Sequence, residues 1–167
     1  MEKTKKCLLS SILGFAFAFA VGVAMIYMPN YLPDTQATKI LLPANNSVWE
    51  GLKLMFWPSL LFFALQFIIF GHGDADHLPA TAMSLTAGII SALAFYYIAS
   101  GAIGFKMPYS ALIFGTAVTF MSSYLLMRDG KLVKNCAVFA GGMLYIDLIA
   151  MFVIFTFYAP ELNLFAY

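Results

Sequence analysis

Five long apolar segments constrain the fold of this chain more than any other feature of its sequence. They cover residues 7–29, 51–70, 81–103, 109–127 and 137–158. Each is close to the ~20 residues that an α-helix needs to cross a hydrocarbon layer of about 30 Å. The sequence therefore predicts an all-α fold, an integral membrane bundle of five transmembrane helices that forms a single domain over residues 1–167.

The composition favours lipid over water as the medium that most of the chain touches. Hydrophobic residues make up 62% of the sequence and charged residues only 10%, whereas a soluble domain carries about 25% charged residues. The formal net charge of +1 offers no basic stripe to neutralise phosphates, so no nucleic-acid partner is expected. The expected partner is the lipid bilayer.

The distribution of lysine and arginine predicts the orientation of the five helices, because cytoplasmic connections carry an excess of these residues. If the N-terminus is inside, the outer side carries three: Lys39, Lys53 and Lys106. The inner side then carries six: Lys3, Lys5, Lys6, Arg128, Lys131 and Lys134. We expect the N-terminus inside and the C-terminus outside.

The connection between the first two predicted helices ends in a helix-start signal. Residues 30–46 are too rich in proline for regular structure to be expected there. Ser47 followed by Glu50 is a capping box in front of an apolar run, so a helix should begin at this point. In such a box each side chain bonds the amide of the other residue.

The polar and aromatic side chains around this helix start support two interpretations. Trp49, Lys53 and Trp57 recur at every fourth position, so they share one helix face. One interpretation is an interfacial anchor, an aromatic belt with a lysine that reaches the headgroups. The other is an outward-facing polar mouth that binds a small molecule or a lipid. Its candidate residues are Asn45, Ser47, Trp49, Glu50, Lys53 and Trp57.

Asp147 is the only acidic residue inside a predicted span, near the middle of the fifth. Acids at such depth are costly in hydrocarbon and serve proton relays or substrate paths. The alternative is a protonated structural acid that bonds a neighbouring helix. The helical rise separates Asp147 from Lys53 by about 10 Å or more along the membrane normal, so a direct ion pair is not expected.

Four candidate metal ligands lie within six residues: His72, Asp74, Asp76 and His77. Imidazole with carboxylate suits zinc or manganese, whereas one short loop rarely supplies a whole site, so a solvated loop is the alternative. The sequence lacks the HExxH, GxSxG, Walker and CxxC motifs. It therefore indicates no bound cofactor and leans away from an enzyme.

Two stripes of small residues mark the first predicted span. One consists of Gly14, Ala18 and Gly22, and the other of Ala16, Ala20 and Ala24. Stripes of this kind let helices approach closely in a membrane. They favour close contacts with neighbouring helices, including those of a homo- or hetero-oligomer.

Two motifs carry a resemblance to a family of small bacterial membrane proteins that is known only as a domain of unknown function. Its members read Pro-Val-Asn-Glu-Ser-Val-Trp-Glu-His-Leu-Lys-Leu at the second span and Phe-Thr-Phe-x-Pro-Pro-x-x-x-Leu-Phe near the end. The matching residues here are Asn45, Ser47, Trp49, Glu50, Leu52, Lys53, Phe155, Thr156, Phe157, Pro160, Leu164 and Phe165. The resemblance implies a five-span, multi-pass protein of the bacterial cytoplasmic membrane. On this topology the two motifs lie on one face.

Three departures from the family pattern concern polar residues or a proline. Asn46 stands where the family has glutamate, Gly51 where it has histidine, and Ala159 where it has the first proline. If the two family glutamates and the histidine form a site, this chain keeps only Glu50. An activity that needs all three would be lost or changed.

Three hypotheses for function follow from these patterns. The leading one is a binding protein or carrier for a small solute or a proton, with the outward-facing polar mouth at its entrance and Asp147 deeper. The second is a membrane-embedded hydrolase or metalloenzyme that uses Glu50 or the histidine-containing loop. The third is a structural or partner subunit of a membrane complex.

Overall fold

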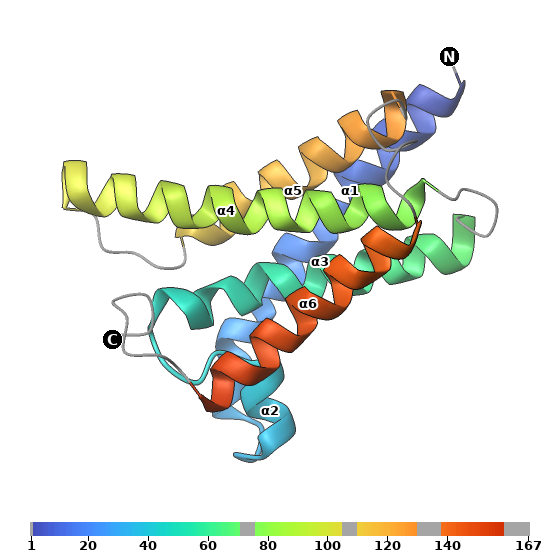
Figure 1. Ribbon diagram of the computed structural model, residues 1–167. Helices are drawn as coiled ribbons and strands as arrows, with labels where there is room; N and C mark the ends of the chain where they lie inside the picture. Colours follow the sequence, from blue (N-terminus) through green and yellow to red (C-terminus); the bar gives the residue numbers. More distant parts are fainter. Residues whose placement is uncertain (1, 71–75, 105–109, 130–137, 159–167) are drawn as a thin grey trace.

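The computed structural model describes residues 2–70, 76–104, 110–129 and 138–158, and in these ranges it is helical without a strand (Figure 1). The all-α fold expected from the sequence is therefore confirmed for the described chain. The elements, in order, are α1 (Glu2–Tyr27), the 3-10 helix η1 (Met28–Asn30), α2 (Gln36–Leu41), α3 (Val48–Phe70), α4 (His77–Ile103), α5 (Ser110–Asp129) and α6 (Val138–Phe157).

Four helices of the described chain are long and apolar enough to cross a membrane, namely α1, α3, α4 and α6. In α5 the apolar stretch is shorter, Leu112–Arg128. These helices fit a membrane protein. Two helices begin earlier than the predicted segments: α1 at Glu2 rather than residue 7, and α4 at His77 rather than near residue 81. Pro79 lies in the first turn of α4, where a missing N–H breaks no helical hydrogen bond.

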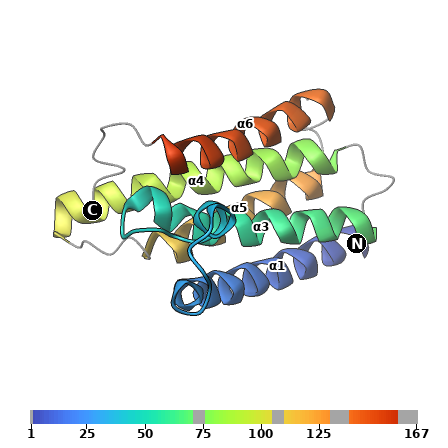
Figure 2. The same ribbon diagram turned by 90° about the horizontal axis from the view of Figure 1, so that it is seen from below.

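The long helices form a bundle in which α4 packs most extensively on α5, and α1 packs on both α3 and α5. Figure 2 shows α1 and α6 on opposite sides of the bundle, with α3 and α4 between them. The contacts of α6 are mainly with α4, and it also touches α2. We name the two ends of the bundle by their contents: the α2 end, where α3 begins, and the N-terminal end, where α1 begins.

One small-residue stripe of α1 is used inside the chain. Gly14 faces the rings of Phe62 and Phe120, and a Cβ added at Gly22 would lie 2.5 Å from the carbonyl oxygen of Leu54. Pro58 has no N–H to donate to that carbonyl. Gly22 thus brings α1 against a carbonyl that the proline leaves without its helical partner, a contact suited to a weak Cα–H···O interaction.

The second stripe, Ala16, Ala20 and Ala24, lies exposed on the outer surface of α1. Ala18 of the first stripe is fully buried. The two stripes therefore have different surroundings, and only the second faces away from the described helices.

The expectation of irregular structure over residues 30–46 is wrong, because this connection contains α2. Thr35 caps the helix: its side chain accepts from the Thr38 N–H, and the Thr38 side chain accepts from the Thr35 N–H. Pro33 and Pro43 lie outside the helix on either side. The prolines thus set the limits of a short helix instead of preventing it.

Candidate functional site

The start of α3 is capped by its own sequence, as the capping box predicts in part. The Glu50 N–H donates to the Ser47 hydroxyl at 3.3 Å. The reciprocal bond is different from expectation, because the Ser47 N–H donates to the Asn45 side-chain oxygen at 2.9 Å. The Glu50 carboxylate instead accepts from the Ala44 N–H at 2.8 Å. Because Asn45 accepts from the Ser47 N–H in place of Glu50, the Glu50 carboxylate is available to a second partner.

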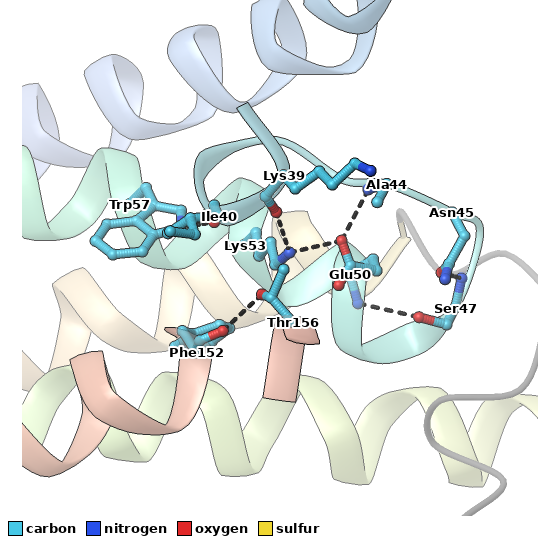
Figure 3. A network of polar contacts seen from close by, with 10 residues as sticks. All are labelled: Lys39, Ile40, Ala44, Asn45, Ser47, Glu50, Lys53, Trp57, Phe152 and Thr156. Atoms are coloured by element: carbon cyan, nitrogen blue, oxygen red, sulfur yellow. Dashed lines mark hydrogen bonds and ion pairs between the residues drawn. The ribbon is translucent and has the colours of Figure 1, made fainter. Parts of the chain in front are cut away.

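That second partner is Lys53. Its Nζ lies 2.7 Å from Oε2 of Glu50, in an ion pair whose lysine side chain is 0% exposed. The same ammonium donates to the backbone carbonyl of Lys39 at 2.7 Å (Figure 3). Lys53 therefore does not extend to headgroups as an interfacial anchor would; it points inward. A buried ion pair of this kind is expensive to break, because either partner alone is an unpaired charge in an apolar surrounding.

Lys53 and Trp57 both donate hydrogen bonds to carbonyls at the C-terminal end of α2. The last carbonyls of a helix have no partner within the helix. The Thr38 carbonyl accepts from the Leu42 N–H at 2.8 Å, that of Lys39 from Lys53, and that of Ile40 from Nε1 of Trp57 at 2.9 Å. The four-residue spacing of Lys53 and Trp57 in α3 thus matches two successive carbonyls of α2. A cation at a helix C-terminus also complements the helix dipole.

The two sequence motifs meet at this end of the bundle. Trp49 stacks on Phe152 with ring centroids 4.8 Å apart and meets Phe155 edge-on at 5.4 Å. Phe56 stacks on the same Phe152 at 4.2 Å. The aromatic contacts hold α6 against the start of α3, as the predicted meeting of the motifs on one face requires. The motif residues Pro160, Leu164 and Phe165 lie outside the described residues.

A model of a family of unknown function, DUF6512, matches residues 1–167. The chain belongs to the DUF6512 family. No curated protein and no solved structure matches it. The DUF6512 assignment agrees with the resemblance carried by the two motifs, and it supplies no activity.

Asp147 of this DUF6512 protein lies apart from the network around Glu50. It is exposed on the outer surface of α6, and it makes no hydrogen bond or ion pair with another described residue. The structure does not bring Asp147 into contact with Glu50 or Lys53, and a role for Asp147 deeper than the mouth stays a prediction. Five residues separate position 147 from the buried Phe152. The Asp147 side chain therefore points well away from the buried face of α6.

The candidate metal loop is described only in part. His72 and Asp74 lie outside the described residues, Asp76 precedes α4, and His77 is buried in its first turn. Within the described ranges no three histidine, cysteine or acidic side chains gather as metal ligands would. The metal site stays a prediction.

A groove toward the N-terminal end of the bundle was not predicted from the sequence. This groove, of about 300 Å³, is lined by Leu60, Phe63, Ala64, Phe67, His77, Leu78, Thr81, Gly142, Tyr145 and Ile149. It therefore runs between α3, α4 and α6. In the sequence, Gly142 and Tyr145 have the spacing of two residues on one face of a helix. Many helices share this spacing, so it does not by itself predict a groove.

The buried pair of this DUF6512 member keeps some binding capacity. An ammonium has three donors, and Lys53 uses two of them. Both bonds to the Glu50 carboxylate end on Oε2, so Oε1 accepts none from the described residues. One N–H of Lys53 and one oxygen of Glu50 thus remain without a bond to the described residues, and the Glu50 side chain is 6% exposed. Such an arrangement can accept a proton on the carboxylate or hold a small polar group.

Proposed function

We propose that the protein is a non-enzymatic membrane protein that binds a proton or a small solute at the Glu50–Lys53 pair and carries it across the bilayer. The observation that supports this proposal is the buried ion pair with an unused N–H on Lys53 and an unused oxygen on Glu50. Ionisable groups inside a membrane span are rare and commonly mark ion or substrate pathways.

The chemistry of the pair favours a proton or a very small ligand. Uptake of one proton by Glu50 from one side and release of one proton from Lys53 to the other side leave both groups neutral, so one proton is carried and no unpaired charge remains in the apolar interior. A polar solute would instead accept from the third N–H of Lys53. Either event weakens the bond from Lys53 to the Lys39 carbonyl, which helps to hold α2. In this proposal α2 is the movable cover of an outward-facing mouth lined by Asn45, Ser47, Trp49 and Trp57.

The proposed topology has five spans, with the N-terminus inside, the C-terminus outside, and the protein in the bacterial cytoplasmic membrane. The fifth span is α5, whose apolar stretch is shorter than the others. The burial of Lys53 against Glu50 supports the orientation. It removes Lys53 from the outer connections, which then hold two basic residues against six inside.

Proton uptake into liposomes tests the function. The full chain is reconstituted with a trapped pH-sensitive dye, and a potassium gradient with valinomycin supplies the driving force. Wild-type protein should acidify the lumen faster than empty liposomes, and Glu50→Gln should abolish the difference. Asp34→Asn is the matched control, because this carboxyl lies on the surface in an exposed pair with Lys39 at 3.3 Å. Equal fluxes for wild type and Glu50→Gln would refute the proton form.

The solute form has a separate test. Small organic acids, amines and sugars are screened for a rise in the melting temperature of the detergent-solubilised protein. A true ligand stabilises wild type and Asp34→Asn, because it binds only the folded state, and it leaves Glu50→Gln unchanged. Identical shifts in all three proteins would contradict a site at the pair.

A second candidate function, a partner subunit, is favoured by Asp147. This carboxyl lies midway along α6 on the exposed surface without a described partner. A charged side chain at the bilayer centre costs about 2.5–3.5 kcal/mol on insertion scales, and a hydrogen-bonding group on another membrane helix would offset that cost. A photoreactive residue at Met143, exposed on the same helix, should give one discrete adduct in native membranes. Asp147→Leu should abolish it; an unchanged adduct pattern would count against the subunit.

A further inference from the structure

The groove between α3, α4 and α6 is a feature that the proposed carrier function does not use. It lies away from the α2 end, because its α4 residues, His77, Leu78 and Thr81, belong to the first turns of that helix. We propose that this groove binds one hydrocarbon chain of a membrane lipid, inserted from the N-terminal end of the bundle.

The lining of the groove matches a hydrocarbon chain. Apolar side chains of α3 and α6 form most of its wall, with Phe63 and Phe67 as the largest. Its volume of about 300 Å³ lies at the lower limit of small-ligand pockets. Along α3 it extends from Leu60 to Phe67, about 10 Å at the helical rise of ~1.5 Å per residue. A slot of this shape fits one extended chain.

The location of the groove identifies the source of that chain. All three helices around it are long and apolar enough to span a membrane, so the medium beside an open groove is lipid hydrocarbon. A water-soluble ligand would have to cross that medium. An apolar slot left empty would lose the dispersion contacts of its lining atoms. The lipid chain is therefore the occupant that the surroundings supply.

Polar groups form part of the lining of the groove. The Tyr145 hydroxyl donates to the Thr81 hydroxyl at 2.7 Å, and Thr81 donates to the His77 carbonyl at 2.9 Å. The phenolic oxygen has given its only proton to Thr81 and is left as an acceptor. Tyr145 and Thr81 both line the groove, and an acceptor of this kind suits a donor on the lipid headgroup or glycerol.

Gly142 gives the groove room and offers the test. A Cβ at Gly142 would meet only the Leu78 side chain, at 3.8 Å, so a larger side chain enters the groove without a backbone clash. Gly101 offers a matched control, because a Cβ there meets nothing within 4 Å, and it lies near the other end of α4. Gly142→Phe should fill the groove, and Gly101→Phe should add the same side chain elsewhere.

The experiment uses the full chain in vesicles of phosphatidylethanolamine that carries a diazirine midway along one acyl chain. After irradiation, mass spectrometry maps the adducts. Adducts should concentrate on groove residues such as Phe63, Phe67 and Ile149. Gly142→Phe should reduce them about tenfold, which corresponds to about 1.4 kcal/mol of binding free energy, and Gly101→Phe should not. Ala64→Phe, from the opposite wall, serves as the second blocking variant if Gly142→Phe fails to fold.

Two outcomes would overturn the proposal. One is labelling spread evenly over exposed side chains such as Ile69, Ile98 and Ile146, which would mean bulk lipid contact only. The other is groove labelling that Gly142→Phe and Ala64→Phe both leave unchanged. Neither outcome bears on Glu50 or Lys53, so this proposal and the carrier proposal fail independently.

Discussion

Two carboxyl groups in this protein have the same chemistry and opposite surroundings. Glu50, at the α2 end, is 5% exposed and is held by the Lys53 ammonium and the Ala44 N–H. Asp147, in the middle of α6, is exposed on the outer surface and has no partner among the described residues. Glu50 lies near a helix start, where N–H donors are available, and its carboxylate is hydrogen-bonded. Asp147 lies on the outer surface of a peripheral helix, where only the surroundings of the protein can supply a partner.

The comparison separates what holds the fold from what can face a partner. At the α2 end Lys53 and Trp57 bond α2, and Trp49 stacks on α6. These residues therefore stabilise the fold whether or not a ligand binds. The exposed face of α6 makes no such contacts within the described chain. A substitution at the α2 end should change stability, and one at Asp147 should change association.

The largest expected effect is that of Lys53→Met. It leaves the Glu50 carboxylate buried without its cation and the Lys39 carbonyl without its donor. Breaking a buried pair in this way costs about 3–5 kcal/mol. Lys39→Met is the matched control, because the Lys39 side chain is 46% exposed in its pair with Asp34, and surface pairs are worth about 0–1 kcal/mol. Thermal unfolding in detergent, followed by near-UV circular dichroism, measures both.

The double variant Glu50→Gln/Lys53→Met sharpens this result. It removes both charges, so it should recover part of the stability that Lys53→Met loses, since no unpaired charge is left buried. Equal losses in Lys53→Met and Lys39→Met would show that the pair contributes nothing to the fold.

The next effect in size concerns the contact between α4 and α6. A Cβ at Gly141 would lie 2.7 Å from the Cα of Pro79, whereas a Cβ at Gly142 meets only Leu78 at 3.8 Å. Gly141→Ala should therefore destabilise the protein by about 1–3 kcal/mol through overpacking. Gly142→Ala should be neutral or gain up to about 1 kcal/mol from helix propensity. The same unfolding measurement compares the two, and a reversed order would contradict the contact.

Trp57→Phe should have a smaller effect. The substitution keeps the aromatic ring and deletes the N–H that bonds the Ile40 carbonyl. A hydrogen bond of this kind contributes about 0.5–1.5 kcal/mol. The looser α2 should also raise the rate at which a cysteine placed at the buried position Leu42 reacts with a soluble maleimide. No change in that rate would mean that Trp57 does not hold α2.

The smallest expected effect is that of Asp147→Asn on the isolated chain in detergent. An exposed residue without a partner usually changes stability by less than about 0.5 kcal/mol. A loss as large as that of Lys53→Met would reveal an internal partner and would end the contrast between the two acids. A change in the oligomeric state in native membranes, without a change in stability, would support the partner subunit.

Local signals in the sequence predicted much of this architecture. The apolar segments located the long helices to within a few residues, apart from the starts of α1 and α4, and the capping box located the start of α3. The motif pattern predicted the DUF6512 family. These features depend on hydrophobicity and on bonds between residues close in the chain, so reading the sequence in order was enough.

Two local bonds and one distant contact escaped prediction. The Ser47 N–H bonds Asn45 instead of Glu50, and Thr35 caps the short helix α2 between two prolines. The surroundings of Lys53 depended on where the end of α2 comes to rest. A lysine at the end of a span extends to headgroups unless acceptors lie inside, and sequence spacing does not reveal those acceptors.

The sequence by itself determined that this is a helical protein with several segments suited to hydrocarbon, because hydrophobicity acts on each segment separately. Only the tertiary structure decided that Glu50 and Lys53 pair inside while Asp147 faces outward, and that three helices leave a groove. A helix carries its side chains on all sides, and which side is buried depends on where its neighbours pack.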